Sequence, residues 1–151
     1  MGRAPLAALA VALAGCGPGP SFVTDHGVQV YLETQDPAAL DRSQAQRMED
    51  YLLEGVVRLG YGKDESLRCL SQAEVRFLDS TFTCWDGQRS CAGEQWDEVL
   101  LVAKEQCPFA SAYVHELAHW LQQCVHGDYD PDHQETALWA WVNSCPLRCE
   151  E

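Results

Sequence analysis

The stretch His115-Glu116-Leu117-Ala118-His119 determines how the rest of this chain is interpreted. It lies in an apolar run whose spacing predicts an α-helix over residues 108–125. On a helix, side chains four residues apart project from nearly the same side, so His115 and His119 can bind one metal ion together. Glu116 lies one step around the helix, where its carboxylate can reach a water molecule at the metal rather than the metal itself.

This HExxH pattern resembles the active-site helix of the zincins, which are zinc-dependent metallopeptidases. The resemblance implies that Zn²⁺ is bound by His115, His119 and a third protein ligand. It also implies hydrolysis of peptide bonds in a peptide or protein substrate, through a zinc-activated water with Glu116 as the general base.

Three residues are candidates for the third ligand. His133 lies beyond a glycine and a proline that let the chain leave the helix and return, and its spacing from the motif is similar to that of Spartan-type zincins. Glu135 is the alternative; it resembles the glutamate ligand of gluzincins, or it orients a ligand imidazole. His126 fits less well, because no glycine turn follows the motif as in metzincins and the helix carries it about 10 Å beyond His119. We expect His133 to complete the site.

The segment after the helix holds two further groups of interest. Tyr129 and His126 are the candidate donors to the oxyanion of the reaction. Asp128, Asp130 and Asp132 alternate as in a calcium loop, but the glycine and the closing glutamate of an EF-hand are absent at the required offsets. We therefore expect these aspartates to cap turns, with Asp132 near the zinc ligands.

The N-terminus predicts export. After a short cationic start, residues 6–14 form an apolar run that is too short to cross a bilayer as a mature helix. The run ends in Leu13-Ala14-Gly15-Cys16, which resembles a bacterial lipobox. The resemblance implies that residues 1–15 are removed as a signal peptide and that Cys16 is acylated. By the same rule, Gly17 after the cysteine implies delivery to the outer membrane.

Residues 16–24 are then the lipidated cysteine and a tether, and residues 25–151 form one metal-binding domain. The formal net charge of −13 excludes nucleic acid as a partner that the protein attracts through its overall field. Contact with the membrane is expected through the lipid on Cys16.

Export also predicts that the cysteines other than Cys16 form disulfides, with one of the seven left over. Candidate pairs are Cys84 with Cys91, across a loop, and Cys124 with a C-terminal cysteine. Cys107 and Cys124 bracket the HExxH helix, which would separate them by about 25 Å. A disulfide requires Cα atoms within about 7 Å, so this pair is excluded.

Hydrophobic periodicity predicts an α+β fold. Asp36 and Pro37 fit the N-cap and first residue of a helix that extends to residue 59. The other predicted elements are strands at 28–34, 74–78 and 98–103 and a short terminal helix at 134–143. This order resembles the minimal zincin layout. It implies a small, disulfide-stapled single domain, with a twisted sheet packed on a long N-terminal helix and the HExxH helix.

The sequence thus predicts a lipid-anchored zinc metallopeptidase of the bacterial cell envelope. The alternative is a non-catalytic lipoprotein in which zinc and disulfides stabilise an interaction module. The number of protein ligands distinguishes the two, because a structural zinc site is closed by four and a catalytic site keeps one position for water.

Overall fold

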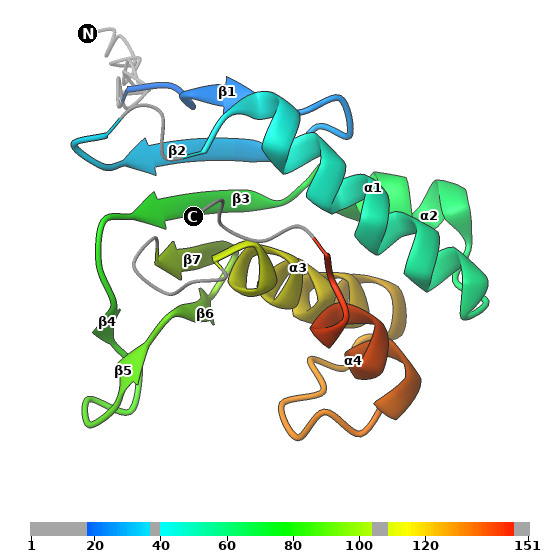
Figure 1. Ribbon diagram of the computed structural model, residues 1–151. Helices are drawn as coiled ribbons and strands as arrows, with labels where there is room; N and C mark the ends of the chain where they lie inside the picture. The colour runs from blue at the N-terminus through cyan, green and yellow to red at the C-terminus, as the bar shows by residue number, and fades with distance from the viewer. Residues whose placement is uncertain (1–17, 37–39, 104–108, 147–151) are drawn as a thin grey trace, which may run out of the picture.

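The computed structural model describes residues 18–36, 40–103 and 109–146. The predicted signal peptide and Cys16 lie outside these residues, as do Cys107 and Cys149. The described residues form an α+β fold with a mixed five-stranded sheet, a two-stranded sheet and four helices (Figure 1). None of these helices is both long and apolar enough to cross a membrane.

The main sheet has three parallel strands at its centre and one antiparallel strand at each edge. Its order is β1 (Phe22–Val23), β2 (Gln29–Glu33), β3 (Glu74–Leu78), β7 (Val99–Ala103) and β6 (Gly93–Trp96). The strands β4 (Phe82–Thr83) and β5 (Ser90–Cys91) pair in a small hairpin that projects from the sheet. The helices are α1 (Arg42–Arg58), α2 (Lys63–Leu70), α3 (Phe109–His126) and α4 (Thr136–Asn143).

One face of the sheet carries most of its buried side chains. The register places Val30, Val75 and Leu100 beside one another, and all three are buried. The next residue along each strand points to the opposite face, where Arg76 bonds to carboxylates of neighbouring residues. The helices therefore cover one face of the sheet, and α3 contacts β7 and β6 directly.

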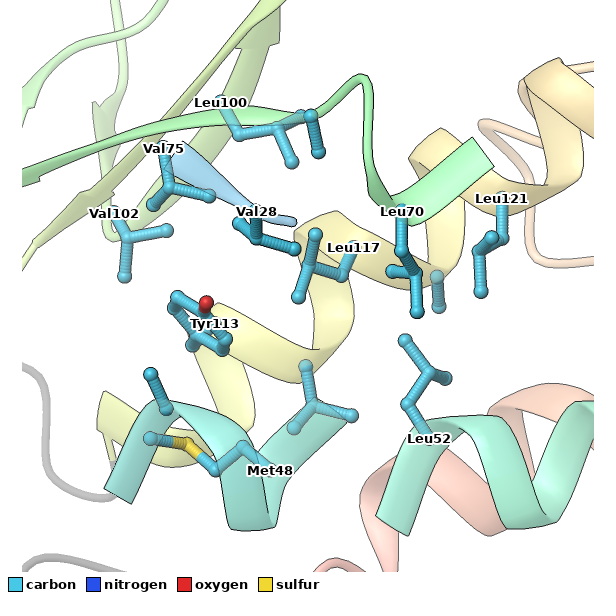
Figure 2. Close-up of a cluster of buried hydrophobic side chains, with 14 of the residues drawn as sticks. Val28, Met48, Leu52, Leu70, Val75, Leu100, Val102, Tyr113, Leu117 and Leu121 are labelled. Carbon is cyan, nitrogen blue, oxygen red and sulfur yellow. The ribbon is translucent and has the colours of Figure 1, made fainter. Parts of the chain in front are cut away.

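The core lies between this face and the helices. Figure 2 shows side chains from the sheet, α1, α2 and α3 meeting in one cluster. Tyr113, Leu117 and Leu121 recur at four-residue spacing and face this cluster. His115 is two residues, or about 200°, around the helix from Tyr113, so it projects from the other side of α3. The same helix thus closes the core and carries the predicted metal ligands.

The structure corrects several predicted element boundaries. The helix predicted to begin at Asp36 and Pro37 begins at Arg42 instead. Asp41 is its N-cap: its carboxylate accepts the N–H of Gln44, whose side chain accepts the N–H of Asp41, which is a capping box. The sequence prediction also missed α2 and β6, and α4 begins two residues later than predicted.

Two disulfides are present among the described residues. Cys84–Cys91 closes the β4–β5 hairpin, as predicted. The second prediction is wrong, because Cys124 bonds to Cys69 and not to a C-terminal cysteine. The reason is the unpredicted helix α2, which packs beside α3 and brings its last turn next to Cys124. Trp120 of α3 also donates its indole N–H to the carbonyl of Cys69, at 2.8 Å.

The segment predicted to be a tether contributes to the sheet. β1 pairs with β2, and the N–H of Ser21 donates to the carbonyl of Val30 at 2.8 Å. Regular secondary structure therefore begins before residue 25, at β1.

Candidate metal centre

Three histidine side chains converge on one point at the side of α3 that faces away from the core. His115 and His119 come from α3, and His133 comes from the loop between α3 and α4. The Nε2 atom of His119 lies 3.1 Å from that of His115 and 3.2 Å from that of His133. No other cluster of three or more potential metal ligands occurs in the part of the chain that the structure describes.

His115 and His119 are held in the neutral state that a metal ligand requires. Nδ1 of His119 lies 2.8 Å from the carbonyl oxygen of Tyr129, which places its proton on Nδ1 and leaves the lone pair on Nε2. Burial, with a smaller effect of the neighbouring histidines, lowers the pKa values of His115 and His119 from 6.5 to about 4. Imidazole nitrogens this close to one another either share a hydrogen bond or bind one cation, and a set of three fits a divalent ion such as Zn²⁺.

Asp130 holds the loop that delivers His133. Its carboxylate accepts the main-chain N–H groups of Gln134, at 2.6 Å, and Glu135, at 3.0 Å. It also accepts the indole N–H of Trp139 at 2.7 Å. Burial opposes ionisation of Asp130, but these hydrogen bonds prevail and its pKa is lowered. Asp130 and His133 both have positive φ, at 49° and 54°. The hydrogen bonds therefore stabilise a backbone conformation that residues other than glycine rarely adopt.

The indole of Trp139 packs against all three histidines. Its ring centroid lies 4.9 Å from that of His115, 4.4 Å from His119 and 4.2 Å from His133. The side chain is buried, and its N–H is bonded to Asp130. Trp139 therefore joins α4 to the cluster and limits the positions that the three rings can take.

Glu116 lies beside the cluster, 5% exposed. Its Oε2 atom has no hydrogen-bond partner among the described residues. Burial, and to a lesser degree the charge of Glu94, raises the pKa of Glu116 from 4.5 to about 8. A pocket of about 360 Å³ adjoins it, lined by Ser90, Cys91, Ala92, Gly93, Ala112, His115 and Glu116.

Gly93 of β6 allows this placement of the carboxylate. A Cβ atom at residue 93 would lie 2.5 Å from Oε1 of Glu116, which is inside van der Waals contact. Glycine thus lets the edge strand pass directly over the carboxylate, and the sequence pattern gave no indication of this contact.

The remaining predicted site residues fall into two groups. The ring of Tyr129 stacks on His119, with centroids 4.4 Å apart, and burial and the charge of Glu116 raise its pKa to about 12. His126 packs edge-on against Tyr61, and the three-histidine cluster does not include it. Glu135 is also outside the cluster, and its main-chain N–H donates to Asp130.

Two residues of the site were missed or misassigned from sequence. The sequence singled out Asp132 among the three aspartates, whereas the buried acid that holds the loop is Asp130. Three alternating aspartates contain no local signal that separates them. Trp139 could be placed on a terminal helix, but its packing on the histidines depends on how α4 meets α3.

The chain matches no protein-family model, and no curated protein or solved structure is significantly similar to it. Fold and site together define a small α+β protein with a three-histidine cluster on one helix and the loop that follows it.

Proposed function

We propose that the protein is a zinc metallopeptidase with a minimal zincin-like fold. The observation that carries this proposal is the convergence of three imidazole Nε2 atoms, together with the pocket that His115 and Glu116 both line. The predicted export and lipidation at Cys16 extend the proposal to an enzyme that is anchored in the bacterial cell envelope and cleaves peptide substrates there.

His115, His119 and His133 are the residues that would hold zinc. Zinc held there would supply Lewis acidity, which would lower the pKa of a water to about 7 and favour the ionised form of Glu116. The described cluster contains three protein ligands and no fourth. This number favours a catalytic site over a closed structural one.

Glu116 is the proposed proton carrier. Its carboxylate lies against the pocket, with an oxygen that no other described residue engages. From this position it accepts the proton of the attacking water and passes it to the leaving amine. Tyr129 stacks on His119 and its pKa is raised, so its hydroxyl stays neutral and is the proposed O–H donor to the oxyanion.

The position of β6 at the edge of the sheet favours a peptide as the substrate. The N–H of Ala103 bonds to the carbonyl of Ala92, so the alternation of an antiparallel pair directs the main-chain groups of Gly93 away from β7. Gly93 also lines the pocket beside Glu116. An extended peptide can add to this edge through main-chain hydrogen bonds, with its backbone passing the metal ligands.

The test combines metal content and cleavage on the exported chain. We expect one zinc per chain, measured by mass spectrometry of the metal, and cleavage of members of a mixed peptide library. The variant Glu116→Gln should keep its zinc and lose cleavage. Zinc bound by a protein that cleaves nothing, or cleavage that survives in Glu116→Gln, would contradict the proposal. The first result would favour the non-catalytic interaction module.

A further inference from the structure

The segment that adjoins the pocket carries a group of solvent-exposed aromatic residues. We call residues 82–98, which include β4, β5 and β6, the aromatic arm. Trp85 is 78% exposed and Trp96 is 38% exposed. Exposed tryptophan is costly in water, and on a soluble protein a group of such side chains usually marks a contact surface.

The tryptophans are held in place by contacts within the arm. Their rings pack edge to face, with centroids 5.8 Å apart, and Phe82 packs edge-on against Trp96 at 6.5 Å. The carboxylate of Glu94 accepts the main-chain N–H of Trp85, at 2.9 and 3.0 Å, and the indole N–H of Trp96, at 2.5 Å. The disulfide Cys84–Cys91 closes the loop behind them. A surface that is ordered before binding loses less entropy when a ligand arrives.

The charge around these rings is negative. The arm contains four acidic residues, Asp86, Glu94, Asp97 and Glu98, and one basic residue, Arg89, which is paired with Asp86. Aromatic faces attract cations, and neighbouring carboxylates strengthen that attraction. The same charge, on a chain of net charge −13, opposes contact with anionic lipid. The chemistry of the surface therefore matches a cationic side chain.

The arm and the pocket share one stretch of chain. Ser90 and Cys91 form β5, which pairs with Thr83 and Phe82 next to the tryptophans, and both residues also line the pocket that contains Glu116. Gly93 and Trp96 both belong to β6, but Gly93 faces Glu116 and alternation turns Trp96 to the opposite face of the strand. A peptide added to this edge would alternate in the same way, so every second side chain of the peptide would face the side of the tryptophans.

We propose that Trp85 and Trp96, with the carboxylates around them, bind a basic side chain of the peptide substrate. The inference rests on the proposed function, because it names the substrate class for that site. It makes the protein selective for peptides with lysine or arginine a few residues from the cleaved bond.

The test measures binding separately from cleavage. Blocked pentapeptides with arginine, norleucine or glutamate at the centre are titrated into Glu116→Gln protein loaded with zinc, with tryptophan fluorescence as the readout. We expect the arginine peptide to bind about 5-fold more tightly than the norleucine peptide, as a cation–π contact predicts, and the glutamate peptide to bind most weakly. Added salt should reduce the difference.

Two sets of variants locate the effect. Adding Trp85→Ala or Trp96→Ala should reduce the preference for arginine to less than 2-fold. The double change Asp97→Asn, Glu98→Gln should weaken the preference. Its matched control is the double change Asp64→Asn, Glu65→Gln on α2, which removes the same charge outside the aromatic arm. This control should leave the preference for arginine unchanged.

Each outcome decides the inference. Equal binding of the three peptides, or a preference for arginine that survives both tryptophan changes, would overturn it even if wild-type protein cleaves peptides. Trp85-dependent binding of phosphatidylglycerol vesicles without peptide preference would overturn it in favour of a lipid surface. A Trp85-dependent preference for arginine, in a protein whose wild type cleaves nothing, would support the binding surface and contradict the peptidase proposal.

Discussion

Two buried carboxylates, Glu49 of α1 and Glu116 of α3 itself, lie on different sides of α3, and their surroundings differ. On the core side, Glu49 of α1 accepts the hydroxyl of Tyr113 at 2.7 Å. On the other side, Glu116 lies beside three histidines and a pocket. Burial is the main cause of a raised pKa in both, to about 7 for Glu49 and about 8 for Glu116. A raised pKa alone therefore does not identify a functional acid; the neighbouring ligands and the access to a pocket do.

The largest expected effect comes from removing the charge of each acid in turn. Glu116→Gln should lower the peptidase rate by about 10²–10⁴-fold, the range for a general base. Glu49→Gln should leave the rate nearly unchanged, because Glu49 contacts the core and not the pocket. Initial rates on one cleaved peptide, at matched zinc content, measure both. A comparable loss of rate in both variants would show that the two sides of α3 are not functionally distinct.

The second prediction concerns stability and pH. The pKa of Glu49 in the folded protein, about 7, is above its ordinary value of 4.5, so the folded state holds this proton more tightly than the unfolded state. The resulting stabilisation is complete below pH 4.5, is lost as the pH rises to about 7, and amounts to about 3 kcal/mol.

Urea unfolding of wild type and Glu49→Gln between pH 4 and pH 8 checks this prediction. The difference in free energy of unfolding between the two should shift by about 3 kcal/mol in favour of the variant as the pH rises. A constant difference would mean that Glu49 remains ionised in the folded protein.

The third prediction addresses the loop that brings His133 to α3. Asp130→Asn keeps the shape of the side chain and removes the charge that accepts three N–H groups. We expect zinc to bind about 10–100-fold more weakly, as when a residue that orients metal ligands is changed. Competition with a chromophoric chelator gives the affinity. The exposed Asp132→Asn is the control and should bind zinc like wild type.

The sequence could predict the parts of the site that depend on local geometry. The four-residue spacing of His115 and His119 is a property of any helix, and the glycine and proline before His133 allow the chain to return. Asp130, Trp139 and Gly93 could not be assigned roles, because their contacts join segments whose relative positions depend on the whole fold.

The fold shows the same division between local and long-range information. Alternating apolar residues were sufficient for β3, whose predicted and observed limits agree. The prediction for Cys124 was wrong because its pairing depends on how α2, a helix of eight residues, packs beside α3.

The smallest predicted effect is that of Tyr113→Phe, which removes one hydroxyl from the core side of α3. Glu49 then loses a hydrogen-bond donor, and we expect the free energy of unfolding to fall by about 1 kcal/mol at pH 8, where Glu49 is ionised. Because this hydrogen bond lowers the pKa of Glu49, its removal should also move the pH-dependent loss of stability upward. Zinc affinity, measured in the same samples, should not change. A weaker zinc site in Tyr113→Phe would show that the core contact also positions His115, and the two sides of α3 would then be coupled.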